Sequence, residues 1–152
     1  MKLSELATPL RTVAAGSTLQ EAARAMDRHH VGTLVVVDDE EPVGMISDRD
    51  LALHGLLECD PATAEVRSCM SAPLVRCSEE ASAGEAARTM KEEGIRRVAV
   101  EDASGELIGV VSADDLLQVV GKRISFLTST IHQELSAEAG GPPSGSHTYG
   151  SE

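Results

Sequence analysis

The sequence predicts an α/β (α+β) fold in which one small unit occurs twice in tandem. The chain aligns with itself at an offset of 64 residues, so that residues 21–26 fall on residues 85–90. Each copy shows an amphipathic segment, two β-branched runs and a second amphipathic segment. The hydrophobic residues make up 41% of the chain and include one Phe, one Tyr and no Trp. An aliphatic core of this kind suits helices packed on sheets.

The repeat continues after a one-residue insertion at a turn, where the offset becomes 65. Four identities follow, which place Gly44, Ser47, Asp50 and Leu51 on Gly109, Ser112, Asp115 and Leu116. The period is longer than the roughly 20–50 residues of solenoid repeats and indicates a duplicated unit. We therefore expect repeat 1 at residues 1–57, a linker with Pro61 at 58–65, and repeat 2 at 66–121.

The first helix of each repeat is expected at residues 18–29 and 82–93. Each begins with a hydroxyl residue followed three positions later by Glu, in Thr18-x-x-Glu21 and Ser82-x-x-Glu85. This pattern is a capping box, in which the two side chains satisfy free N–H groups at the helix start. Gly94 is placed to end the second of these helices.

Buried strands are expected at residues 34–38 and 98–102, and second strands at 43–47 and 107–112. A further short strand is expected near 10–14 and near 74–78. The second helices start near Asp48 and Ala113. Neither copy has enough apolar surface alone, so we expect the two sheets to pack together around one shared core.

Two regions lie outside the repeats. Residues 122–138 place Ile124, Leu127, Ile131 and Leu135 at helical spacing and predict a C-terminal helix that covers the core or meets a partner. Residues 139–152 are rich in Gly, Pro, Ser and His and predict a flexible tail.

Charge and cysteine usage exclude several classes. The net charge of -12 argues against nucleic acid and against an anionic membrane surface. Cys59, Cys69 and Cys77 are odd in number and lack C-x-x-C spacing, so neither a disulfide framework nor a zinc site is expected. Without an apolar signal region or a run long enough to cross a bilayer, we expect a cytoplasmic protein.

The pattern repeated most closely is Gly-apolar-apolar-Ser-x-x-Asp, at residues 44–50 and 109–115. A strand delivers the Ser to a helix N-terminus, where free N–H groups favour a phosphate. The Asp carboxylate has two oxygens that suit the vicinal diol of a ribose. The same spacing is also a plain capping box, so a structural role is the alternative.

Arg96 and Arg97 stand at the start of a strand, and Arg suits phosphate because its planar fork donates two parallel hydrogen bonds. Adjacent strand residues point to opposite faces, so at most one should enter a given cleft. Repeat 1 has Gly32 and Thr33 at these positions. We therefore expect unequal clefts, with the one served by Arg97 the better anion site.

Other polar groups are assigned to the surface. His29 and His30 are adjacent at a helix end, where two side chains rarely converge on one metal, and Arg49 is expected at the surface of a helix start. No metal site is expected. No nucleophile elbow, P-loop or Rossmann pattern is present, so the sequence does not indicate an enzyme.

The segments VGTLVVVDDEEPVGMISDRDLAL and IRRVAVEDASGELIGVVSADDLL closely resemble the two halves of a CBS domain pair, also called a Bateman module. The resemblance covers residues 1 to about 120, and it is closest to small stand-alone bacterial proteins of this type. It implies tandem β-α-β-β-α repeats packed sheet to sheet with pseudo-twofold symmetry, two clefts between them, and a homodimer. Members usually bind adenosine derivatives, including AMP, ADP, ATP and S-adenosylmethionine, and no cofactor is required.

The resemblance also implies residue roles. Asp50 and Asp115 would hold ribose hydroxyls, while Ser47, Ser112 and Arg97 would lie near phosphate. The backbone around Thr33 and Val35, and around Ala99, would receive the adenine, and Gly44 and Gly109 belong to the same ligand-binding motifs.

Many members have Pro where this chain has Val35 and Ala99. Two functions remain open. The first is a sensor that binds an adenosine ligand and signals through a conformational or dimer change to a partner that the sequence leaves unknown. The alternative is a structural interaction or dimerisation module with vestigial clefts.

Overall fold

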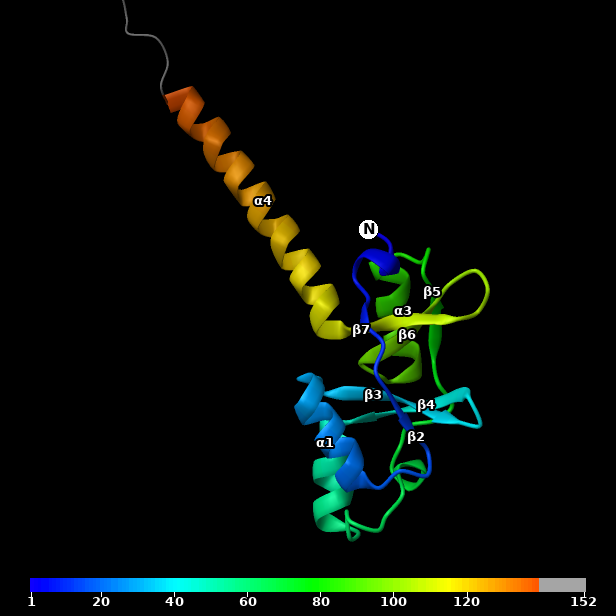
Figure 1. The fold of residues 1–152 in the computed structure, drawn as a ribbon. Helices are drawn as coiled ribbons and strands as arrows, with labels where there is room; N and C mark the ends of the chain where they lie inside the picture. Colours follow the sequence, from blue (N-terminus) through cyan, green and yellow to red (C-terminus); the bar gives the residue numbers. More distant parts are fainter. Residues whose placement is uncertain (140–152) are drawn as a thin grey trace, which may run out of the picture. The chain divides into compact units, whose positions relative to one another are not determined.

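The structure is a computed structural model, and it describes residues 1–139. The chain divides into two units, one of Met1–Leu116 and one that begins at Leu117. The strands found in the described residues all lie in the first unit, which therefore carries both sheets (Figure 1).

The elements alternate as the repeat predicts. In chain order they are η1 (Leu3–Glu5), β1 (Thr8–Pro9), β2 (Thr12–Ala14), α1 (Leu19–His29), β3 (Thr33–Asp38), β4 (Glu41–Ser47), α2 (Asp48–Asp50), η2 (Leu51–Gly55), η3 (Val66–Ser68), β5 (Arg76–Ser78), α3 (Ala83–Glu93), β6 (Arg97–Glu101), β7 (Leu107–Ser112) and α4 (Ala113–Ala139).

Each repeat supplies one sheet. The first has the order β2-β3-β4 and the second β1-β7-β6-β5, with the central hairpins antiparallel and the short strands β2 and β5 parallel to β3 and β6. The predicted short strands are confirmed. Strand β4 begins two residues earlier than predicted, because Asp39 and Glu40 make the turn alone with positive φ of 46° and 65°.

The N-terminal segment of each repeat crosses to the sheet of the other repeat. Strand β1, which the sequence reasoning missed, pairs with β7 of repeat 2. In the same way Ser71 pairs with Met45 of β4 in repeat 1, with N–H to O distances of 3.0 and 2.8 Å. The repeats are therefore tied together by an exchange of short segments at two sheet edges.

The core is divided rather than shared, which corrects the prediction of one common core. One buried cluster packs α1 on the first sheet and the other packs α3 on the second. Val66 enters the first cluster and Leu3 enters the second, so each cluster is completed by the N-terminal segment of the other repeat. Val35 and Ala99 are also fully buried but belong to neither cluster. Because side chains alternate along a strand, they face away from the cluster residues beside them.

The predicted capping boxes are confirmed at both first helices. Thr18 and Ser82 each accept from the N3 backbone N–H, while Glu21 and Glu85 accept from the N-cap backbone N–H. Gly94 ends α3 with φ of 66°. Hydrogen bonds from Ser82 lower the pKa of the Glu85 carboxyl. Its contribution to stability is therefore present above the usual carboxyl pKa and is lost as the pH falls through the lowered value.

The second helices differ in length. In repeat 1 the helix starts at Asp48 as predicted and continues as the π-helical η2. In repeat 2, α4 runs without interruption from Ala113 to Ala139, so the separate helix predicted at 122–138 is the continuation of the second helix of repeat 2. The predicted tail at 139–152 lies outside the described residues apart from Ala139. Within residues 1–139, no helix combines the length and apolar character that a membrane span requires.

Gly44 and Gly109 permit the exchange at the sheet edges. A Cβ atom on Gly109 would lie 2.5 Å from the Thr8 carbonyl oxygen, and one on Gly44 would lie 2.5 Å from that of Ser71. Backbone atoms cannot yield as a flexible side chain can. These two glycines are therefore required by close backbone approach.

We predict that Gly109→Ala lowers the free energy of unfolding by about 1–3 kcal/mol, because the added methyl group forces β1 away from β7. Urea denaturation measures the loss. Gly121→Ala is the matched control, since nothing lies within 4 Å of the added atom inside α4, and it should be neutral or stabilising by up to about 1 kcal/mol. Equal effects of the two substitutions would contradict the close-approach explanation.

Candidate functional site

The Ser–Asp pairs of both repeats form the same hydrogen-bonded turn at a strand-to-helix junction. In repeat 2, the backbone N–H and the hydroxyl of Ser112 donate to Asp115 Oδ2 at 2.8 and 2.6 Å, and the Asp115 N–H donates to Ser112 Oγ at 3.1 Å. In repeat 1, Ser47 and Asp50 make the same three bonds at 2.9, 2.9 and 3.2 Å. The capping role that the sequence left as an alternative is thus present in both copies.

Capping leaves part of each carboxylate free. Both Ser donors reach Oδ2, and no bond from the described residues reaches Oδ1 of Asp50 or Asp115. A carboxylate oxygen offers two lone pairs. Each Asp can therefore cap its helix through one oxygen and accept two hydroxyl groups of a ligand through the other.

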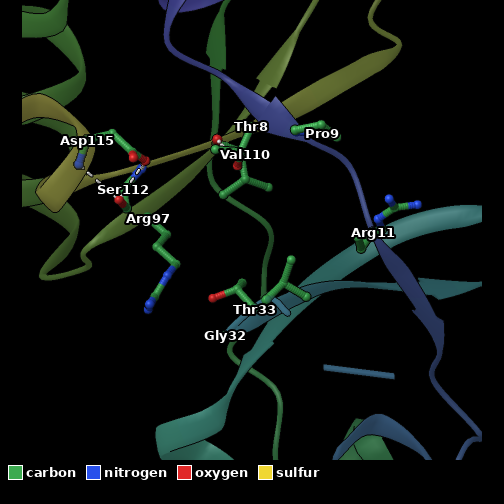
Figure 2. A pocket seen from close by; sticks show the side chains of 10 residues that line it. Thr8, Pro9, Arg11, Gly32, Thr33, Arg97, Val110, Ser112 and Asp115 are labelled. Atoms are coloured by element: carbon green, nitrogen blue, oxygen red, sulfur yellow. Dashed lines mark hydrogen bonds between the residues drawn. The ribbon is translucent and has the colours of Figure 1, made fainter. Parts of the chain in front are cut away.

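Asp115 lines a cleft that is built from both repeats (Figure 2). We call it the Ser112 cleft; its volume is about 240 Å³. Repeat 2 contributes the Ser–Asp pair and Arg97, and the facing wall comes from Arg11, Thr33 and their neighbours. The lining residues are Thr8, Pro9, Arg11, Val31, Gly32, Thr33, Arg97, Val110, Ser112 and Asp115.

A second cleft of about 260 Å³ holds the Ser–Asp pair of repeat 1, and we call it the Ser47 cleft. Here the pair belongs to repeat 1 and the facing wall comes from the start of β6. Its lining residues are Thr33, Met45, Ser47, Arg49, Asp50, Ser71, Gly94, Ile95, Arg96 and Arg97. The two clefts are therefore related by exchange of the repeats.

The arginines are placed differently from the sequence expectation. Arg97 lines both clefts, and Arg96 lines the Ser47 cleft beside it. Alternation of side chains along a strand does not apply to Arg96, because it precedes β6 and lies in a bend. Arg49, expected at the surface, also lines the Ser47 cleft. The placement of Arg97 thus does not favour one cleft over the other.

Three of the four arginines that line the clefts form no ion pair with the described residues. Arg96 pairs with Asp114 at 3.2 Å at an exposed site. Arg11, Arg49 and Arg97 form no ion pair with any other residue among positions 1–139. In a chain with net charge -12, unpaired guanidinium groups at two clefts provide the local positive feature that an anionic ligand needs.

Thr33 lines both clefts. Its Oγ1 atom is buried and is the only buried side-chain polar atom in the described part of the chain without a hydrogen-bond partner. A buried polar group without a partner is destabilising and often marks a functional position. The sequence indicated residue 33 through its backbone, whereas the structure points to its side chain.

Four of the predicted site residues do not line either cleft. Val35 and Ala99 are fully buried, and their N–H groups donate to the carbonyl oxygens of Arg11 at 2.8 Å and Val75 at 3.0 Å. Those N–H groups are thus already bonded within the sheets. Gly44 and Gly109 hold the exchanged segments, as described above.

The sequence reasoning missed the contributions from the exchanged segments. Thr8, Pro9 and Arg11 reach the Ser112 cleft, and Ser71 reaches the Ser47 cleft, because each segment crosses to the other repeat. The duplicated Pro-Leu pairs at 9–10 and 73–74 were the available signal. Within the part of the chain that the structure describes, no three metal-ligating side chains gather, and His29 and His30 take no part in either cleft.

Known proteins share this architecture. The family model of the CBS domain matches residues 3–55 and again residues 66–122. An uncharacterized protein from Methanopyrus kandleri is 35% identical over 130 residues, which cover 82% of this chain and 64% of that protein. The CBS domain-containing protein YhcV of Bacillus subtilis is 33% identical over 133 residues, covering 86% and 94%.

A solved structure provides a ligand-bound comparison. A CBS domain protein from Pyrobaculum aerophilum, crystallised in complex with AMP, superposes with a TM-score of 0.67 at 26% identity. The match covers 76% of this chain and 89% of that protein. The chain therefore spans under two thirds of the Methanopyrus relative but most of the other two proteins.

We predict that Thr33→Val raises the free energy of unfolding of the ligand-free protein by about 1 kcal/mol, because it removes a buried hydroxyl without a partner. Chemical denaturation without added ligand measures the change. Thr12→Val, at an exposed position of β2, is the control and should shift stability by under about 0.5 kcal/mol. A clear destabilisation by Thr33→Val would show that the hydroxyl has a stabilising partner.

Proposed function

Because the chain belongs to the CBS domain family, we propose that it is a regulatory module that binds an adenosine-containing ligand in the two clefts. The candidate ligands are AMP, ADP, ATP and S-adenosylmethionine. Binding would be reported to a partner protein through a change in the module or in its association, without turnover of the ligand.

One observation carries this proposal. Each cleft combines an Asp carboxylate that has one oxygen without a hydrogen bond and an Arg guanidinium without an ion pair among the described residues. In the Ser112 cleft these groups are Asp115 and Arg97, and in the Ser47 cleft they are Asp50 and Arg97 with Arg49. A carboxylate accepts from the hydroxyls of a ribose, and a guanidinium binds phosphate. A nucleoside phosphate presents both groups, and the AMP complex of the Pyrobaculum protein supports this class of ligand.

The construction of the clefts suggests how binding is transmitted. Each cleft has one wall from each repeat, with Thr33 facing the Ser–Asp pair of repeat 2 and Arg97 facing that of repeat 1. A ligand that contacts both walls binds best when the two sheets hold one relative position. Because the ligand binds this arrangement more tightly than others, binding shifts the module towards it.

The proposal also includes an oligomeric state and a cellular location. A homodimer is expected from the family resemblance. A cytoplasmic location accords with Cys59, Cys69 and Cys77, which are all free thiols, as a reducing compartment requires.

We predict that a saturating adenosine ligand, at about 100 times its Kd, stabilises the protein by about 2.7 kcal/mol. For a chain of this size that corresponds to a rise in Tm of about 5–10 °C, which a thermal shift assay with each of the four ligands measures. No response to any of them would contradict ligand binding and leave an interaction module as the function.

The variant Asp50→Ala/Asp115→Ala should abolish the response, because both clefts lose the ribose acceptor. Loss of two helix caps lowers the baseline Tm as well, so a matched control is needed. Glu21→Ala/Glu85→Ala removes the same type of cap from α1 and α3 without touching either cleft. It should lower the baseline Tm similarly, because it removes the same half of each capping box, and retain the ligand response. Loss of the response in both double variants would assign the effect to capping alone.

A second candidate function is association of two copies through α4. Its apolar residues Val120, Ile124, Leu127 and Ile131 recur at intervals of three and four residues and are 51–60% exposed. This is the spacing of a coiled-coil seam. Lys122 and Arg123 lie towards one end of this stripe and Glu134 towards the other, so a second copy in antiparallel orientation places opposite charges side by side.

We predict that two copies of the full-length protein associate through this stripe and that Ile124→Asp/Leu127→Asp converts the dimer to the monomer. Light scattering coupled to size-exclusion chromatography gives the mass directly. Ser129→Asp adds a charge on the opposite face of the same helix and should leave the mass unchanged. Equal masses for the wild type and the double variant would exclude the stripe as the association surface.

A further inference from the structure

Arg97 and Thr33 are each shared between the two clefts. Arg97 lines the cleft of its own repeat with Ser112 and Asp115, and it also lines the cleft of the other repeat with Ser47 and Asp50. Figure 2 shows the Arg97 side chain extending from the start of β6 towards the region of Thr33 on the facing wall. The boundary between the clefts is therefore formed by side chains that belong to both.

Strand register explains this sharing. Thr33 is the Cα partner of Ser47, and Arg97 is the Cα partner of Ser112. Each of the two residues thus stands beside the Ser of its own repeat and faces the Ser–Asp pair of the other. Positions 33 and 97 are equivalent in the repeat, but only position 97 carries a charge.

One cation therefore serves two anion sites. Arg97 has no carboxylate partner among residues 1–139, so its guanidinium is available to a phosphate in either cleft. Two parallel hydrogen bonds to one phosphate fix the orientation of the guanidinium. Fewer of its N–H groups can then donate to a second phosphate. The other arginines are not shared, since Arg11 lines the Ser112 cleft alone and Arg49 lines the Ser47 cleft alone.

We infer that Arg97 couples the two clefts, so that an anionic ligand in one cleft weakens the binding of a second ligand in the other. This inference rests on the proposed function, because it concerns the same two clefts. The module would then respond to ligand over a wider concentration range than two independent sites. When the second phosphate loses one charge-assisted hydrogen bond to Arg97, the second binding step is weakened about tenfold.

Isothermal titration with AMP tests the coupling in the full-length protein. Asp115→Ala leaves the Ser47 cleft as the only intact site, and Asp50→Ala leaves the Ser112 cleft. If the clefts are coupled, the second step in the wild type is about tenfold weaker than the two single-cleft variants together predict. In an Arg97→Gln background the same three proteins should give additive isotherms, while Arg97→Lys should restore the coupling. Arg11→Gln is the control, because it weakens one cleft and leaves the coupling in place.

The outcomes separate this inference from the proposed function. A wild-type isotherm equal to the sum of the single-cleft isotherms overturns the coupling and leaves ligand binding intact. Binding in only one of the two clefts does the same. The absence of AMP binding in the wild type, with ADP, ATP and S-adenosylmethionine also inactive, overturns the proposed function itself. A cooperative melting transition for each variant shows that it is folded before it is titrated.

Discussion

The hydrogen-bonded turn between a serine and an aspartate fixes the geometry on which both clefts depend. In each repeat three bonds of 2.6–3.2 Å join the last residue of a strand to the first turn of a helix. The turn uses Oδ2 of Asp50 and Asp115 and leaves Oδ1 without a bond from the described residues. The structural and ligand-binding roles of the motif are therefore compatible, because they use different oxygens of the same carboxylate.

The second constraint is the exchange of segments between the repeats. Thr8 reaches the sheet of repeat 2, and Ser71 reaches the sheet of repeat 1, at positions that only glycine permits. This exchange completes each hydrophobic cluster with a residue from outside its repeat, and it brings Arg11 to the Ser112 cleft. Each cleft therefore requires both repeats, because each repeat supplies one of its two walls.

Local features of the fold could be predicted from the sequence, while features that depend on contacts between repeats could not. Capping boxes and β-branched runs act over a few residues, and the helices and hairpins they predict are present. The single shared core was wrong, because periodicity identifies a buried face without showing which segment covers it. The clefts add two further examples. Arg96 was assigned by strand alternation, but it lies one residue before the strand, where alternation does not apply. Thr33 has a polar side chain whose lack of a partner can be seen only in three dimensions.

The central claim is that the two clefts receive an adenosine nucleotide between a half-free carboxylate and Arg97. A crystal structure of the protein grown with AMP tests this claim most directly. We predict ribose hydroxyls within hydrogen-bond distance of Oδ1 of Asp115 or Asp50, with the phosphate in contact with Arg97. AMP bound elsewhere on the protein, or in a cleft with its ribose away from both carboxylates, would contradict it.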